Sequence, residues 1–133
     1  MQGCPLSVVL INVLLAVWSE AIDKEIREAN PRSFADDSHI AATTITGMTQ
    51  AAEISTEFSQ LTGMQLNAEK SIGGATTPSA RRQMTNVRIG GLSIKVELQH
   101  RTVGADIVVS RKRHGNTIKK RIARGAKTGA RIG

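Results

Sequence analysis

Two adjacent carboxylates, Asp36 and Asp37, stand in the stretch "PRSFADDSHI", residues 31–40. Both are ionised at neutral pH. At ~4 Å two unit charges interact by roughly 1 kcal/mol in water and by about 4 kcal/mol near a protein surface. A divalent cation beside the pair offsets this repulsion, and Mg²⁺ prefers carboxylate and phosphate oxygens. The alternative is that the pair only makes a turn, because Asp is a favoured turn residue.

The residues on either side of the pair predict the elements that position it. Residues 33–44 predict a β-hairpin with the two carboxylates at its tip. Before it, residues 5–29 predict one helix: Pro5 suits the first turn, where a missing N–H costs nothing, and the residue before Pro31 is pushed out of the α conformation. After it, residues 46–62 predict a second, amphipathic helix.

The second predicted helix has one apolar stripe and a clear end. Gly63 is well placed as its C-terminal stop. Residues 64–71 then predict a short strand and a turn. The stripe comprises Met48, Ala51, Ile54 or Ser55, Phe58 and Leu61.

The first predicted helix begins with a long apolar run, from Cys4 to Trp18. This run is shorter than the ~20 residues that span a bilayer. A signal peptide is the alternative, but no positive cluster precedes the run and no clear small-x-small cleavage site follows it. Because the segment from Val8 to Trp18 is apolar all round, we expect it to be buried. The amphipathic second half offers two i,i+4 ion pairs, Glu20 with Lys24 and Asp23 with Arg27.

The second half of the chain predicts a linker and then strands. Small residues over 76–86 are typical of a linker. Residues 87–110 predict a β-hairpin or meander, because apolar and polar residues alternate on both sides of Gly90-Gly91, which suit a two-residue hairpin turn. Residues 111–133 form a basic segment with a possible helix over 116–132, weakened by two glycines.

Composition and charge limit the classes of function. The 133 residues include one cysteine, so an internal disulfide is impossible, and no Cys/His array has zinc-site spacing. Aromatic residues make up only 2%, which leaves little for base stacking. Residues 1–79 hold four basic and nine acidic residues, which gives a net charge of −5. Residues 80–133 hold fourteen basic and two acidic residues, which gives a net charge of +12. The basic half is either a nucleic-acid-binding surface or a solvated tail.

Three segments, in this order, resemble the palm of reverse transcriptases, of the type found in non-LTR retrotransposons. They are "QGCPLS" at 2–7, "FADD" at 34–37 and "GMQLNAEKS" at 63–71. An apolar helix separates the first two, and an amphipathic helix separates the last two. The resemblance implies an α+β fold: a partial palm over residues 1–75, made of helix, catalytic hairpin, helix and strand. Weaker resemblance extends to a primer-grip hairpin, in which "TVG" replaces the usual aromatic-Leu-Gly, and to a basic start of the thumb.

The resemblance also implies roles for single residues. It implies RNA-directed DNA polymerisation by two Mg²⁺ ions, with Asp36 as a direct metal ligand and Asp37 as a more peripheral one. Lys70 matches a position proposed to protonate the leaving pyrophosphate; the alternative is a solvated lysine that binds phosphate loosely. Asn67 is expected to fix the turn beside it. The residues that match the template and nucleotide contacts are Gln2, Gly3, Pro5, Ser7 and Phe34, the last in place of the more frequent Tyr.

The family's metal site needs a third carboxylate from a strand upstream of the "QG" segment, and the sequence begins at that segment. We therefore expect this chain to be a fragment without polymerase activity of its own. The expected partners are an RNA template, a DNA primer and deoxynucleotide triphosphates, in the nucleus or cytoplasm and without a membrane. The alternatives are a basic nucleic-acid-binding fragment and a non-functional relic.

Overall fold

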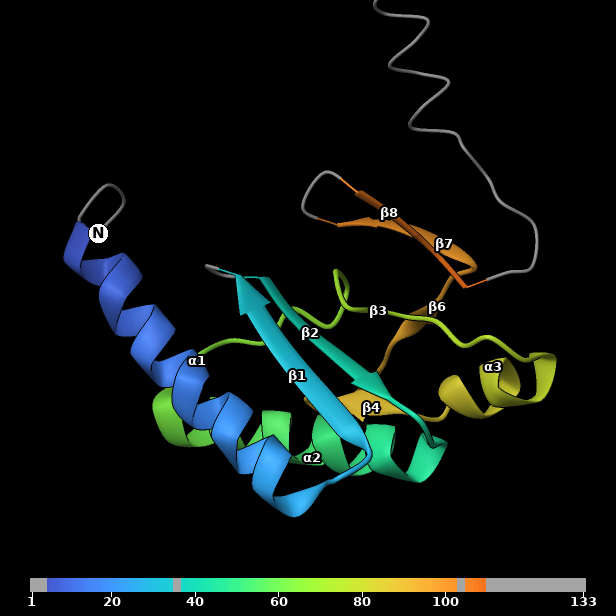
Figure 1. Ribbon diagram of the computed structural model, residues 1–133, viewed down its shortest axis with the longest axis horizontal. Helices are drawn as coiled ribbons and strands as arrows, with labels where there is room; N and C mark the ends of the chain where they lie inside the picture. Colours follow the sequence, from blue (N-terminus) through green and yellow to red (C-terminus); the bar gives the residue numbers. More distant parts are fainter. Residues whose placement is uncertain (1–4, 35–36, 103–104, 110–133) are drawn as a thin grey trace, which may run out of the picture.

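The computed structural model describes residues 5–34, 37–102 and 105–109, and it combines helices with short strands, as expected for an α+β chain (Figure 1). The helices are α1 (Pro5–Glu25), α2 (Ile45–Thr62) and α3 (Pro78–Met84). The strands are β1 (Ala29–Phe34), β2 (Asp37–Ala42), β3 (Ile72–Gly73), β4 (Arg88–Ile89), β5 (Leu92–Ser93), β6 (Lys95–Val96), β7 (Gln99–Thr102) and β8 (Ala105–Val108). They pair as β1–β2, β4–β5 and β7–β8, which are antiparallel, and as β3–β6, which is parallel.

Helix α1 is shorter than the predicted 5–29. It ends at Glu25, and β1 begins at Ala29, because Pro31 favours an extended residue before it. The predicted pair of Glu20 and Lys24 forms, at 2.8 Å. The predicted pair of Asp23 and Arg27 does not form, since the helix stops before Arg27.

One stripe of α1 is buried and the rest of its apolar run is not. Leu15, Trp18 and Ile22 pack in the first hydrophobic cluster with Ile26, Ala29 and Ala51. Most of the other large apolar side chains between Leu6 and Val17 are exposed. The expectation that the segment from Val8 to Trp18 is buried is therefore wrong. In Figure 1 the first turns of α1 extend beyond the rest of the described chain, so they have no neighbouring element to pack against.

Helix α1 also meets the length and composition expected of a membrane span. Its stretch Leu6–Glu25 is the only such stretch in the described part of the chain. This observation is weak evidence, because core helices and signal sequences have the same composition. Leu15, Trp18 and Ile22 belong to the core. A span over all of Leu6–Glu25 would have to expose them.

The predicted hairpin over 33–44 is confirmed, and it is longer than expected. Strands β1 and β2 pair from Ala29 with Ala42 to Phe34 with Asp37. One face of the hairpin packs on the helices: Pro31 is fully buried, and its partner Ile40 contacts the first cluster. The hairpin therefore has one covered face and one face turned away from this core.

Helix α2 confirms the prediction for residues 46–62, and it contacts both hydrophobic clusters. Thr44 caps its start, and Gly63, with φ of 69°, ends it in the left-handed conformation. Ala51 lies in the first cluster, and its neighbour Ala52 lies in the second. Small side chains at both positions let packed elements approach the helix from two sides. Leu61, predicted on the apolar stripe, is instead 87% exposed.

The segment 76–86 is not a linker. It contains helix α3, which begins at the cap residue Thr77 with Pro78 in its first turn. Met84 at its end joins Ala52, Val87 and Ile94 in the second cluster. The prediction of a linker failed because the small residues of this segment are typical of a loop. Thr77-Pro78 is instead a signal for the start of a helix, and the Met84 side chain packs the helix against the second cluster.

The turn at Gly90-Gly91 is confirmed, with φ of 58° and 80°, and it joins β4 to β5. We expected one alternating strand after this turn, but the structure has two short strands there. Of these, β5 pairs with β4, whereas β6 pairs with β3. Ile94 between them is buried, but Leu92 and Leu98 are exposed. No strand forms over 64–71, only the turn. The basic segment 111–133 and its predicted helix lie outside the described residues.

We predict that Ser55→Ala destabilises the protein. The Trp18 indole Nε1 donates to Ser55 Oγ at 2.9 Å in the core, and that hydroxyl donates to the Ala51 carbonyl. Removal of the hydroxyl leaves a buried N–H without an acceptor, which costs about 1–3 kcal/mol of unfolding free energy. Urea unfolding followed by Trp18, the single tryptophan, measures the loss.

Ser59→Ala is the matched control for this substitution. Ser59 is also a buried serine of α2, but its hydroxyl donates only to the Thr56 carbonyl, so no donor is orphaned. We expect its unfolding midpoint to change by less than half as much. Equal midpoints for the two variants would contradict a structural role for the Trp18–Ser55 bond.

Candidate functional site

The register of the hairpin decides where the two carboxylates fall. Phe34 pairs with Asp37, so two residues, 35 and 36, connect the strands. Asp37 is the first residue of β2 and is exposed. Asp36 lies outside the described residues, as do Gln2, Gly3 and the side chain of Phe34. Asp37 therefore lies at the end of the hairpin where the two strands connect, whereas the predicted position of Asp36 stays a prediction.

Asp37 lies on the face of β2 that is turned away from the core. Side chains alternate along a strand, and Ile40 and Ala42 contact the first cluster. Asp37 and His39 therefore share the opposite face, and Arg32 stands across the ladder from His39. An exposed carboxylate on such a face can bind a cation without first losing a protein partner.

His39 is a residue of this face that the sequence analysis missed. Its side chain is half-buried, and its Nε2 has no hydrogen-bond partner in the part of the chain that the structure describes. Most buried polar atoms in proteins have a partner. The sequence did contain a signal for it. Side chains alternate between the two faces of a strand, so His39, two residues after Asp37, lies on the same face as Asp37.

Lys70 lies in the turn that follows α2, with its side chain exposed. The Lys70 backbone N–H donates to both Asn67 Oδ1 and the Asn67 carbonyl, each at 3.1 Å. The prediction that Asn67 fixes this turn is confirmed. No hydrogen bond or ion pair joins Lys70 to Asp37 among the residues described. The structure thus does not connect the predicted general acid to the predicted metal ligand.

The first predicted segment coincides with the start of α1. Pro5 is the first residue of this helix, and Ser7 is partly exposed in its first turn. Both belong to the end of α1 that extends beyond the rest of the described chain in Figure 1. The predicted helix start at Pro5 is confirmed, whereas the predicted contacts with template and nucleotide stay predictions.

The described residues fit a magnesium site only in part. An exposed aspartate at a hairpin is a suitable oxygen ligand. However, no group of three or more His, Cys, Asp or Glu side chains able to hold a metal occurs within residues 5–34, 37–102 and 105–109. A two-metal centre needs more carboxylates than Asp37 and its neighbour in sequence supply.

Shifted pKa values occur away from the hairpin. The hydrogen bond and charge of Lys24 lower the pKa of Glu20, and Glu20 in turn raises the pKa of Lys24. The pKa of Glu97 is lowered mainly by its hydrogen bond with Lys95, whose Nζ lies 2.6 Å away. The first pair is exposed on α1, and the second joins exposed Lys95 of β6 to half-buried Glu97. Ion pairs at the surface are common in proteins, so these shifts do not mark a catalytic site.

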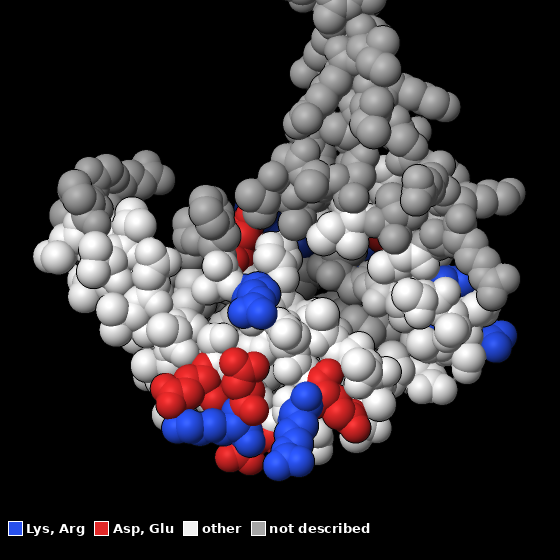
Figure 2. All heavy atoms as spheres, in the orientation of Figure 1, with Lys and Arg blue, Asp and Glu red and all other residues white. Residues whose placement is uncertain are grey.

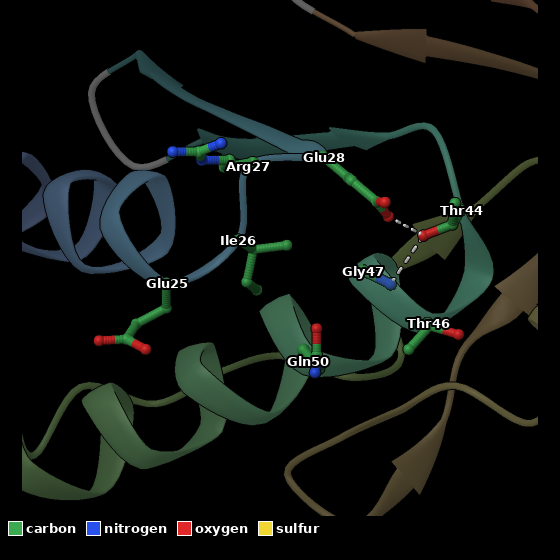
Figure 3. Close-up of a pocket in the computed structure, with 8 residues that line it drawn as sticks. All are labelled: Glu25, Ile26, Arg27, Glu28, Thr44, Thr46, Gly47 and Gln50. Carbon is green, nitrogen blue, oxygen red and sulfur yellow. Dashed lines mark hydrogen bonds between the residues drawn. The ribbon is translucent and has the colours of Figure 1, made fainter.

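An open pocket of about 460 Å³ lies where α1 ends and α2 begins (Figure 3). A small network closes one side of it: Thr44 Oγ1 donates to Glu28 Oε2 and accepts from the Gly47 backbone N–H. This network caps α2 and attaches the chain before β1 to the chain after β2. The pocket does not include any residue that the sequence predicts to act in catalysis or binding. Its lining residues are Glu25, Ile26, Arg27, Glu28, Thr44, Thr46, Gly47 and Gln50.

Comparisons of the chain with protein-family models, with curated proteins and with solved structures found no match. The functional assignment therefore depends on the three motifs and on the position of the acidic pair in the hairpin.

We predict that Thr44→Ala lowers the unfolding free energy by about 0.5–2 kcal/mol, because it removes the cap of α2. Thr44→Ser retains the hydroxyl that bonds Glu28 and Gly47, and it should recover most of the loss. Thermal unfolding monitored by circular dichroism measures both. If Thr44→Ser is as unstable as Thr44→Ala, the hydroxyl is not what stabilises this corner.

Proposed function

We propose that this chain is part of the palm of a reverse transcriptase and that its acidic pair binds Mg²⁺ in the assembled enzyme. The observation that carries the proposal is the pairing of Phe34 with Asp37, because these first and last residues of the "FADD" motif end the two strands of an antiparallel hairpin. The order of helix, hairpin and helix around the motif agrees with the order that the resemblance implies.

In this proposal each carboxylate has its own part. Asp36 supplies oxygens to the metal, and Asp37 supports it from the first position of β2. The metal would lower the pKa of the primer 3′-hydroxyl and neutralise the triphosphate. The buried face of the hairpin, with Pro31 and Ile40 packed on α1 and α2, holds the acidic pair at the end of a rigid support.

The proposed site is completed by a third carboxylate that the hairpin does not contain. Loss of one member of a catalytic unit typically reduces the rate by orders of magnitude. We therefore expect the 133-residue chain alone to show no template-primed incorporation of nucleotides. The charge of its second half supports another candidate function: residues 80–133, with a net charge of +12, would bind nucleic acid with an affinity that falls steeply as salt rises.

The polymerase proposal predicts that residues 2–71 can replace the corresponding segment of an active reverse transcriptase of the non-LTR type. The chimera should incorporate deoxynucleotides on a primed RNA template with Mg²⁺. Asp36→Asn in the chimera should lower the rate at least about 100-fold, because it removes a metal ligand. Primer extension measures the rate.

Glu57→Gln is the control for this experiment, since it neutralises an exposed carboxylate of α2 within the same segment. It should leave the rate within about twofold. An active chimera whose rate survives Asp36→Asn would refute the assigned role of the pair. Salt-dependent binding of RNA by the 133-residue chain that persists after deletion of residues 1–79 would favour the second candidate.

A further inference from the structure

Helix α1 carries a second apolar stripe on the side opposite its buried one. Leu15, Trp18 and Ile22 form the buried stripe. The second stripe is solvent-exposed, and its members are 39–63% accessible. At 100° per residue five of these side chains lie about 120–180° from Leu15 and Ile22, and Leu14 lies at the edge of the stripe, about a quarter of a turn away. The stripe comprises Leu6, Val9, Leu10, Val13, Leu14 and Val17.

The centre of this stripe has the spacing of a helix-pairing seam. Leu6, Leu10, Val13 and Val17 are separated by four, three and four residues, which is the alternation of a and d positions in a heptad. Such a seam packs best against another helix, whose side chains enter the gaps between its own. We therefore expect the partner of this stripe to be a helix with an apolar face.

The absence of charge and the length of the exposed stretch, as opposed to that of the whole helix, argue against a bilayer as the partner. The described first fifteen residues of α1, 5–19, contain no Lys, Arg, Asp or Glu, and this part of the surface is white in Figure 2. A helix that lies on a membrane usually has a basic polar face. The exposed stretch of 6–17 is about 18 Å long at 1.5 Å per residue, whereas the hydrocarbon core is about 30 Å thick.

The exposed area suits a second copy of this chain. A fully exposed Val or Leu side chain presents on the order of 100 Å² of apolar surface. The six partly exposed side chains of the stripe together present on the order of 330 Å². Two copies would bury on the order of 650 Å² of these side chains. This area lies in the range of weak, transient interfaces, below the ~1,200 Å² of stable specific ones.

We propose that the seam Leu6–Leu10–Val13–Val17 pairs antiparallel with the same seam of a second copy, forming a weak twofold dimer. In this arrangement Leu6 faces Val17 of the second copy, and Leu10 faces its Val13, so each large side chain meets a smaller one. A parallel pair would bring together the same ends of both helices, where Glu20, Asp23 and Glu25 outnumber Lys24. The antiparallel pair avoids this repulsion and opposes the two helix dipoles.

Sedimentation equilibrium of the full chain tests the dimer. We expect a monomer–dimer equilibrium with a dissociation constant on the order of 10 µM, as befits an interface at the small end of the range. The double variant L10K/V13K should weaken dimerisation at least tenfold, because it introduces charges at the centre of the seam. Its helix content and Trp18 emission should be unchanged, since both positions face away from the core.

L61K is the matched control, since Leu61 is a more exposed leucine on α2, at 87%. Its dissociation constant should stay within about twofold of the parent. A chain that is monomeric up to 200 µM overturns the proposal, and so does a dimer that L10K/V13K does not weaken. Cosedimentation of a monomeric chain with phosphatidylcholine vesicles would also overturn it in favour of a lipid partner.

Cysteine crosslinking tests the direction of the pair. In a Cys4→Ser background, equal amounts of L10C and V13C chains are mixed and oxidised. An antiparallel seam gives disulfides mainly between L10C and V13C chains, which differ in mass if one carries a tag. A preference for crosslinks between like chains would show a parallel pair and overturn the proposed arrangement.

Discussion

Helix α2 lies against both hydrophobic clusters, and the rest of the described fold depends on this double contact. Ala51 packs beside Trp18 and Ile22 of α1, whereas Ala52 packs beside Met84 and Val87. Large side chains at both positions would push the neighbouring elements away. On the side of α1, the hydrogen bond from the Trp18 indole to Ser55 fixes the orientation of the tryptophan ring against α2. At the other side, the Gly90 backbone N–H donates to Thr56, which attaches the β4–β5 turn to the same helix.

The packing of α1 against α2 determines the position of the β1–β2 hairpin. Pro31 and Ile40 face the first cluster, so strand alternation leaves Asp37 and His39 on the outer face. At the opposite end of the hairpin, Thr44 and Glu28 attach it to the start of α2. A carboxylate that must bind a metal needs such a support, because small displacements of a catalytic group reduce the rate steeply. The packing of the hairpin is thus consistent with the function that we propose for the acidic pair.

The same helix that supports the hairpin also presents an uncovered apolar stripe. Composition alone suggested a buried helix, because no residue from Val8 to Trp18 is charged. Burial needs neighbouring elements, and those of the described chain reach only one side of α1. The exposed apolar residues of α1 are contiguous, unlike singly scattered surface residues, and contiguous patches often mark interaction sites.

Local signals in the sequence determined several features without help from the tertiary structure. Gly90-Gly91 specified a tight turn, Gly63 ended α2, Asn67 fixed the turn before Lys70, and the segment around Asp36-Asp37 specified a hairpin. Each depends on interactions within a few residues. The tertiary structure alone decided the exposure of Leu61 and of most of the apolar run of α1, and the anchoring of α3 through Met84. It also decided that β5 pairs with β4 whereas β6 pairs with β3. These outcomes depend on which distant elements are present to pack or pair, and no local pattern contains that information.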